Sequence, residues 1–247
     1  MKKCLAFTMM TILAISSWAQ GNPMLVNIIQ TEPLGFTDAS GNAMGIHYDI
    51  LMELSKRSEI PFNIRIVPKA RLIGELMKNR VDAAVFFPTP DTDAVTVNAG
   101  TTDVVKLMAL AKKGTPLKSY ADIVAASTVL TMAKMSLGEP FDSDATLKKT
   151  EVLDYESLVR MHVGDRGKVA IGNLIVMFYQ LKKQGVEDVL DPTGFLLRKA
   201  ENKLHISQKS SFVGQAGKLK AILEEMESTG VIEKIIVHYA GSEWKKY

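Results

Sequence analysis

Cysteine is almost missing from this chain: Cys4 is the single one among 247 residues. It lies in residues 1–19, which have the features of a secretory signal peptide: lysines at the start, an apolar run over residues 5–15, and the small residues Ser17 and Ala19 before the cleavage point. The apolar run is well short of the ~20 residues of a membrane span, so a membrane anchor is the weaker interpretation. Removal of this segment would leave a chain without disulfides, stabilised by packing alone, as suits a bacterial periplasm.

Neither a charge excess nor a long apolar run stands out in the rest of the chain. The two lysines of the predicted signal peptide account for two of the formal charges in the net +3, which leaves +1. No basic stripe with interleaved aromatic side chains is present, which argues against a nucleic-acid partner. Beyond residue 19 no apolar run approaches the length of a membrane helix, so we expect the mature protein to be soluble.

The patterns of common catalytic and cofactor sites are missing as well. The chain has no Gly-x-Ser-x-Gly element, and the segment from Gly41 to Gly45 lacks the Gly-x-Gly-x-x-Gly spacing of a dinucleotide site. The four histidines are far apart in the sequence and match no metal-binding spacing. We therefore expect no cofactor, no metal and no enzymatic activity. The histidines are His47, His162, His205 and His238.

Alternating strands and helices make up the stretch from residue 25 to residue 89. Such a βαβαβ unit forms a parallel sheet, and its loops lie together at the carboxyl ends of the strands. These loops carry polar and aromatic residues, which is typical of a small-molecule pocket rather than of a catalytic centre. The predicted strands are 25–30, 62–67 and 83–87, and the predicted helices are 47–57 and 72–79.

A second α/β unit follows, and a C-terminal piece too small to form a domain closes the chain. If that piece packs back on the first unit, the chain crosses twice between two lobes and forms a two-strand hinge. We therefore expect an α/β fold with lobe 1 from residues 20–107 and 204–247 and lobe 2 from residues 108–203. The polar residues 90–98 are expected to form a surface loop. The predicted strands are 104–111, 128–132, 152–153, 169–172, 195–198 and 205–207, and the predicted helices are 119–124, 155–161, 174–181, 218–228 and 232–239.

Three motifs, in order, span essentially the whole mature chain. They are Pro33-x-x-Phe36-x-Asp38-x-x-Gly41-x-x-x-Gly45-x-x-x-Asp49-Ile50, then LMKNRVDAAVFF at 76–87, then Glu156-x-Leu158-x-x-Met161 followed by residues 164–173. Together they resemble periplasmic solute-binding proteins of family 3, the polar amino-acid type. The resemblance implies a bilobal type II periplasmic-binding fold that closes on a small molecule and delivers it to an ABC permease in the membrane. We expect a monomer.

Two departures from that family concern the ligand. Members that bind amino acids usually carry an arginine shortly after the first-lobe Ser/Thr loop, where it holds the α-carboxylate, but residues 89–93 contain none. The second-lobe strand usually ends in an aspartate that pairs with the ammonium group, and the corresponding residue here is Asn173. The motif Pro68-x-x-Arg71 instead resembles a divergent branch whose arginine lies on the neighbouring loop.

Arg71 is the leading candidate for ligand binding. Its planar guanidinium is able to give a carboxylate two parallel hydrogen bonds. The alternative is a surface arginine at a helix start, where the positive end of the helix dipole disfavours a cation. Glu32 either receives a ligand ammonium, holds Arg71, or is a solvated loop charge. We expect the ligand to carry a carboxylate.

The remaining candidates are aromatic and neutral polar side chains on the predicted strand-end loops. Phe36 and Phe87 either sandwich an apolar or planar part of the ligand or pack in the core. Thr89 and Ser136 offer hydroxyl groups where backbone N–H groups also converge. Asn173 both donates and accepts, which suits a neutral polar group.

The same clamp is compatible with two other functions. A ligand-sensing accessory protein would hand its closed form to a membrane receptor rather than to a permease. An enzyme similar to the periplasmic dehydratases that resemble this family would need an acid or base between the lobes, and Glu32 is the good candidate for it.

Overall fold

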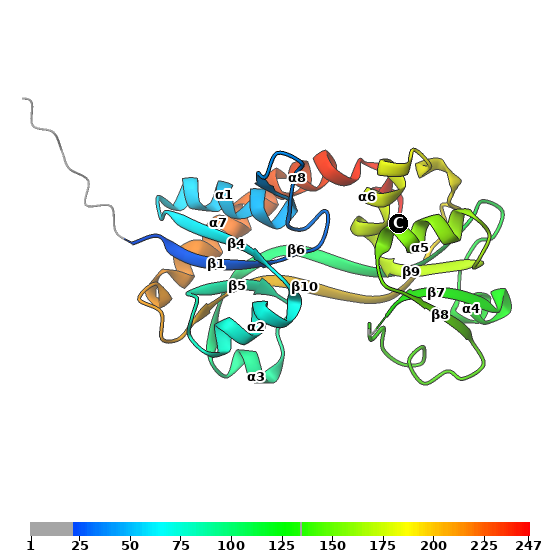
Figure 1. Cartoon of the computed structure of the whole chain (residues 1–247), viewed down its shortest axis with the longest axis horizontal. Coiled ribbons are helices and arrows are strands. Elements are labelled where there is room, and N and C mark those ends of the chain that lie inside the picture. The colour runs from blue at the N-terminus through cyan, green and yellow to red at the C-terminus, as the bar shows by residue number, and fades with distance from the viewer. Residues whose placement is uncertain (1–21, 134) are drawn as a thin grey trace, which may run out of the picture.

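The computed structural model describes residues 22–133 and 135–247, so the predicted signal peptide lies outside the described residues. Two lobes lie side by side and are joined by two long strands (Figure 1). No helix in the described residues is both long and apolar enough to cross a bilayer. The strands are β1 (Met24–Ile29), β2 (Phe36–Thr37), β3 (Ala43–Met44), β4 (Phe62–Val67), β5 (Ala83–Phe86), β6 (Thr96–Ala111), β7 (Thr128–Met132), β8 (Lys148–Val152), β9 (Val169–Asn173) and β10 (Phe195–Ser207). The helices are α1 (Ile46–Ser58), α2 (Lys69–Met77), α3 (Pro90–Asp93), α4 (Tyr120–Ala126), α5 (Tyr155–Val163), α6 (Leu174–Gln184), α7 (Ala216–Ser228) and α8 (Val231–Ala240), with short 3-10 turns η1 (Glu187–Val189), η2 (Val213–Gln215) and η3 (Glu243–Lys246).

One eight-stranded sheet runs through both lobes in the order β4-β1-β5-β10-β6-β9-β7-β8. In lobe 1, β4, β1 and β5 are parallel, as the βαβαβ pattern predicts. In lobe 2, β9, β7 and β8 are also parallel. The antiparallel strands β6 and β10 lie between the two sets. The predicted bilobal α/β fold is therefore confirmed.

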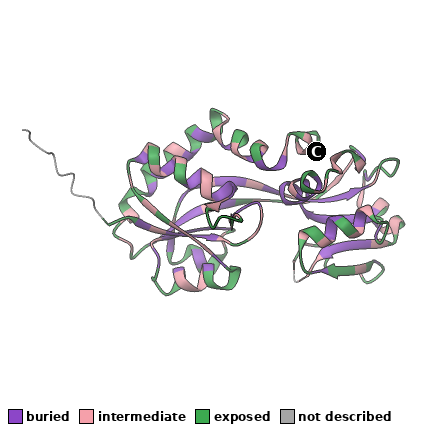
Figure 2. Ribbon diagram, turned by 45° about the horizontal axis from the view of Figure 1, so that its top comes forward, coloured by how far each residue is buried: buried purple, intermediate pink, exposed green. Residues whose placement is uncertain are grey.

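Apolar side chains are buried on both faces of the sheet, and Figure 2 shows the buried residues following the strands of each lobe. In lobe 1, α1, α7 and α8 cover one face of the sheet, and α2 covers the other, where Leu72 and Leu76 pack against Phe86. In lobe 2, α5 and α6 lie on one face, while Ile123 of α4 and Phe141 pack on the other. Each lobe thus has the layered core of an α/β unit.

The hinge consists of the long strands β6 and β10. They pair antiparallel from Thr96 opposite Ser207 in lobe 1 to Ala109 opposite Phe195 in lobe 2, so each strand belongs to both lobes. Three irregularities in register interrupt β10 between residues 196 and 205. Bulges of this kind bend a strand and increase its twist. The predicted lobe boundaries fall inside these two strands and remain predictions.

A buried polar cluster ties α1 to the hinge. His47 Nε2 lies 2.8 Å from Asp103 Oδ1 on β6, and the Asn202 amide on β10 donates to Asp103 Oδ2 at 2.9 Å. His47 is 1 % exposed and Asp103 8 %. Burial alone would raise the pKa of Asp103, but the neighbouring His47 and the hydrogen bonds from Asn202 and Thr102 hold that pKa below its usual range. The cluster fixes the lobe-1 end of the hinge, next to the irregular part of β10.

The C-terminal segment contacts both lobes. Helix α8 packs against α1 and α7 of lobe 1 and against α6 of lobe 2. The Tyr247 hydroxyl donates to the Asp191 carbonyl at 2.8 Å, and its ring lies 5.4 Å from that of Phe178. The sequence predicts that this piece packs on lobe 1, and the structure adds contacts to lobe 2.

Two local predictions were wrong. Residues 90–98, expected to be a surface loop, form α3 and the first part of β6. The hydroxyls of Thr89 and Thr92 cap each other's backbone N–H groups, which stabilises a helical turn that has no apolar periodicity. The extended pieces at 195–198 and 205–207 are one continuous strand, because the polar residues between them pair with β6.

The strand registers place the carboxyl ends of both parallel sets toward each other. In lobe 1 the last residue of β5, Phe86, pairs with Lys203, on the side of β10 that leads to lobe 2. In lobe 2 the last residue of β9, Asn173, pairs with Leu107, on the side of β6 that leads to lobe 1. The residues that follow these strands are called the lobe-1 and lobe-2 strand ends below. They face each other across the hinge, where ligands of α/β sheets bind.

Candidate functional site

Arg71 lies in the first turn of α2, at the lobe-1 strand ends. The preceding Pro68 has extended backbone angles and ends the connection from β4. Arg71 Nε donates to Glu75 Oε1, one helical turn further along, at 2.5 Å. The Arg71 side chain is 59 % exposed, whereas that of Glu75 is 13 % exposed. Its other guanidinium nitrogens are thus free to turn toward solvent while Glu75 holds the Nε side.

Glu75 carries a network that the sequence analysis did not identify. Asn27, fully buried on β1, donates to Glu75 Oε2 at 3.0 Å, and Arg65 on β4 donates both to Glu75 and to Asn27 Oδ1. The hydrogen bonds from Asn27 and Arg71 and the charge of Arg65 lower the pKa of Glu75 to about 2. One carboxylate between two guanidinium groups leaves an excess positive charge around Glu75 of α2, which favours an anionic ligand there.

Glu32 contacts lobe 2 rather than Arg71. Its Oε2 accepts from Lys183 Nζ at 2.9 Å and from the Tyr179 hydroxyl at 3.2 Å, and both partners lie on α6. The hydrogen bond to Glu32 raises the pKa of Lys183. Burial, and then the Glu32 charge, raises the pKa of Tyr179. Of the expected roles of Glu32, holding Arg71 is not seen.

Phe36 belongs to the same contact between lobes. Its ring centroid lies 6.3 Å from that of Tyr179 on α6 and 6.2 Å, edge to face, from that of Tyr239 on α8. Tyr239 in turn donates to Asp49 on α1 at 2.7 Å. Glu32, Phe36, Tyr179, Lys183 and Tyr239 are called the interlobe contact below. Tyr179 and Lys183 belong to α6 and Tyr239 to α8.

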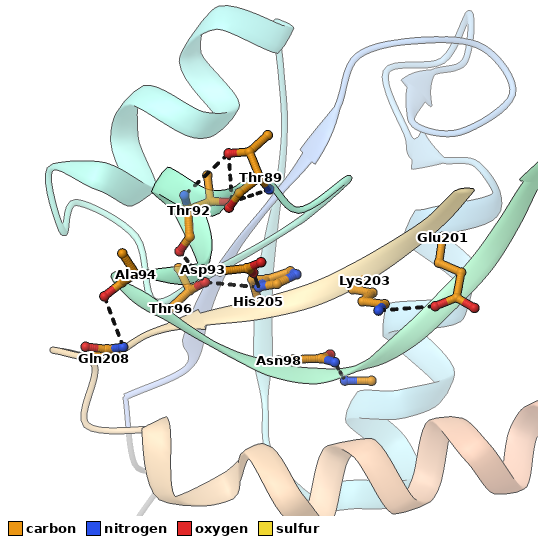
Figure 3. Close-up of polar contacts among 11 residues, drawn as sticks. Thr89, Thr92, Asp93, Ala94, Thr96, Asn98, Glu201, Lys203, His205 and Gln208 are labelled. Atoms are coloured by element: carbon orange, nitrogen blue, oxygen red, sulfur yellow. Dashed lines mark hydrogen bonds and ion pairs between the residues drawn. The ribbon is translucent and has the colours of Figure 1, made fainter. Parts of the chain in front are cut away.

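Phe87 and Thr89 follow β5 at the lobe-1 strand ends. Phe87 is 44 % exposed. The Thr89 hydroxyl is used as the cap of α3, where it accepts from Thr92 N at 3.4 Å. Thr96 links α3 to the sheet: its hydroxyl donates to the Thr92 carbonyl and lies 3.0 Å from His205 Nδ1 on β10 (Figure 3). Thr89 is thus held as the cap of α3, and its hydroxyl already accepts one hydrogen bond.

Two predicted residues lie at the lobe-2 strand ends. The Ser136 hydroxyl, after β7, donates to Asp142 at 2.6 Å, and this bond lowers the pKa of Asp142. Asn173, 8 % exposed, caps α6: its Oδ1 accepts from the backbone N–H of Ile175 at 3.0 Å. The amide nitrogen of Asn173 has no hydrogen-bond partner among the described residues, so a donor remains at this strand end.

The structure therefore divides the predicted residues into three groups. Arg71, Phe87 and Thr89 lie at the lobe-1 strand ends, Ser136 and Asn173 lie at the lobe-2 strand ends, and Glu32 and Phe36 form the interlobe contact. Glu75, four residues after Arg71, was detectable from the sequence as an i,i+4 partner. In residues 22–133 and 135–247, no three His, Cys, Asp or Glu side chains gather as a metal site requires.

Comparison with known proteins gives one family and many similar folds. A family model described as bacterial extracellular solute-binding proteins, family 3, matches residues 25–242. No curated protein sequence matches the chain. The structure is similar to an ancestral cationic amino-acid solute-binding protein, with 14 % identity over 88 % of this chain and 95 % of that one and a TM-score of 0.72.

Two further solved structures are similar along nearly their whole length. A lysine-bound binding component of an ABC transporter from Wolinella succinogenes shows 16 % identity over 91 % of this chain and 99 % of that one, with a TM-score of 0.69. The unliganded open form of an L-cystine receptor from Neisseria gonorrhoeae shows 14 % identity over 90 % and 94 %, with a TM-score of 0.68. At these identities the likeness concerns the fold.

Proposed function

Because the chain belongs to family 3 of the bacterial extracellular solute-binding proteins, we propose that it binds a small carboxylate-bearing solute between its lobes and delivers it to an ABC permease. The solute docks on the lobe-1 strand ends, and closure about β6 and β10 brings the lobe-2 strand ends onto it. Contacts made with both lobes favour the closed state. The permease recognises that closed form.

The excess positive charge of Arg65 and Arg71 around Glu75 is the observation that carries this proposal. Glu75 holds Arg71 Nε, and Arg65 and Asn27 hold Glu75 from the sheet side. The Nε side of the Arg71 guanidinium is therefore held, and its terminal nitrogens stay available to a ligand. A planar guanidinium held on one side binds a carboxylate with two parallel hydrogen bonds and loses less side-chain entropy than an unpaired one.

An enzymatic function on the same scaffold is the second candidate, since one similar structure is described as a precursor of cyclohexadienyl dehydratase. It would need an acid or base free at the strand ends. Glu32 is held by Lys183 and Tyr179 instead, which argues against that role. A ligand-sensing function would use the same closure, and co-purification with a membrane receptor instead of a permease would distinguish it.

Arg71→Ala tests the proposal. A ligand that binds the folded state raises stability by RT ln(1 + [L]/Kd), so a thermal-shift screen of small carboxylates identifies binders. We expect Arg71→Ala to abolish the shift while the unliganded melting temperature stays near that of the wild type. Arg160→Ala is the matched control, because Arg160 is similarly exposed and also pairs with a glutamate four residues away, on α5. Equal ligand-induced shifts in the wild type and Arg71→Ala would refute the carboxylate role of Arg71.

A further inference from the structure

Most of the candidate polar residues already have a hydrogen-bond partner within the protein, whereas Asp91 and Asp93 of α3 remain exposed. The carboxylate of Glu32 is paired with a lysine and a tyrosine of α6. Asp154, at the end of β8, accepts from the backbone N–H of Ser157 at 2.7 Å and from its hydroxyl at 3.0 Å, as the cap of α5. An ammonium group on a ligand would have to compete with these partners for either carboxylate. The hydroxyls of Thr89 and Ser136 and the amide oxygen of Asn173 also have hydrogen-bond partners within the protein.

Large apolar side chains, by contrast, are exposed at the strand ends of both lobes. Phe87 directly follows β5 and is 44 % exposed, and Leu153 directly follows β8 and is 88 % exposed. Of the exposed large apolar side chains in the described part of the chain, Leu153 has the highest exposed fraction. Met132, the last residue of β7, packs partly exposed beside the lobe-2 core. A single exposed leucine needs no explanation, but here exposed apolar side chains follow parallel strands of both lobes, at their carboxyl ends.

From this arrangement we infer the class of the solute: a carboxylate with an apolar body of the size of a leucine or phenylalanine side chain and no ammonium group. The inference rests on the proposed function, since Arg71 is to hold the carboxylate. Phe87 and Leu153 cover the apolar body when the lobes close, which removes their exposed surface from water. The amide nitrogen of Asn173 remains available as a neutral donor.

Matched probes separate this class from amino acids. The probes are 3-phenylpropionate and 4-methylpentanoate, then L-phenylalanine and L-leucine, which add an ammonium group to the same bodies. Propionate lacks the apolar body, and 3-phenylpropionamide lacks the carboxylate. In titration calorimetry we expect 3-phenylpropionate or 4-methylpentanoate to bind at least about tenfold tighter than the amino acid with the same body. The same probe should also bind at least about tenfold tighter than propionate and than 3-phenylpropionamide.

Variants at the exposed apolar residues test where the body lies. Leu153→Ser and Phe87→Ser are each expected to weaken binding of the preferred apolar carboxylate by about tenfold or more. Met52→Ser is the matched control, because Met52 on α1 is 46 % exposed and lies away from the strand ends. The melting temperature without ligand checks that each variant folds.

The possible outcomes separate the inference from the proposal on which it rests. Tighter binding of L-phenylalanine or L-leucine overturns the inferred class and leaves the proposed solute binding intact. Binding of propionate as tight as that of the two apolar carboxylates also overturns the inferred class and leaves the proposed solute binding intact. Binding that Leu153→Ser and Phe87→Ser leave unchanged overturns the roles of these residues. If no carboxylate binds, the inference and the proposed function fail together.

Discussion

At the scale of single residues, the position of Arg71 is set by its partner Glu75, which is held in turn by Asn27 and Arg65. Arg71 was identifiable because arginine is disfavoured at a helix start unless an anion is near. Asn27 and Arg65 were not identifiable, because they lie on adjacent strands that are far apart in the sequence and meet only through the sheet register. Strand registers between non-neighbouring segments are set by packing over the whole sheet, which no local pattern contains.

Glu75→Gln tests this network through its pH dependence. The pKa of Glu75 is about 2 in the folded chain against an ordinary 4.5, so the unfolded chain takes up the proton first as the pH falls. The stability that Glu75 contributes is thus present above about pH 4.5 and is lost as the pH falls toward 2. We expect the melting temperatures of wild type and Glu75→Gln to converge over this range.

Glu156→Gln serves as the comparison, because Glu156 forms one exposed pair with Arg160 and no buried amide supports it. Its melting curve is expected to follow that of the wild type at every pH. A constant difference between wild type and Glu75→Gln from pH 7 to pH 2 would contradict the network.

At the scale of helices and strands, the predicted bounds are correct where an apolar or alternating pattern is flanked by residues that disfavour the element. The bounds of β4 and β7 are those predicted: Pro68 ends β4, and apolar residues make up most of β7. Strand β10 was divided in two because Lys199, Glu201 and Lys203 interrupt its apolar pattern, although their backbones pair with β6. Helix α3 was missed because it has no apolar periodicity and is stabilised by threonine capping instead.

Asn173 is the N-cap of α6, so its contribution to stability can be measured directly. Loss of an N-cap side chain typically costs about 1 kcal/mol, so Asn173→Ala should lower the free energy of unfolding by about that amount in urea denaturation. Asn173→Asp keeps an accepting oxygen at the cap and should retain the stability. Equal losses in both variants would show that the cap is not what Asn173 contributes.

At the scale of the whole molecule, the lobes are joined by the hinge strands, by the C-terminal segment and by the interlobe contact. The pair between Glu32 and Lys183 links residues that are 151 positions apart in the sequence, so no motif could have joined them. The sequence did predict two lobes and two crossings, because alternating strands and helices leave few topologies. The ligand contact expected of Glu32 stays a prediction, and the structure adds its pairing with Lys183 and Tyr179 of the other lobe.

Glu32→Gln should shift the balance between open and closed lobes. The Lys183 and Glu32 side chains are 49 % and 37 % exposed, so the pair contributes less than about 1 kcal/mol and is weakened by salt. We expect a larger mean distance between fluorophores on the two lobes at low salt, and a smaller difference from wild type at high salt. Lys112→Met, which removes a pair to Asp165 within lobe 2, is the control. A distance unaffected by Glu32→Gln at low salt would mean that the pair does not govern lobe separation.

The continuity of β6 and β10 also determines the order in which the molecule is completed during synthesis. Strands β1, β4 and β5 come first in the chain, yet β5 gains its other neighbour only when β10 follows, after all of lobe 2. Until then β5 presents an unpaired edge, the kind of surface on which strands of other chains assemble. The nascent first lobe is therefore begun first and finished last, and its protection depends on how quickly the second lobe folds.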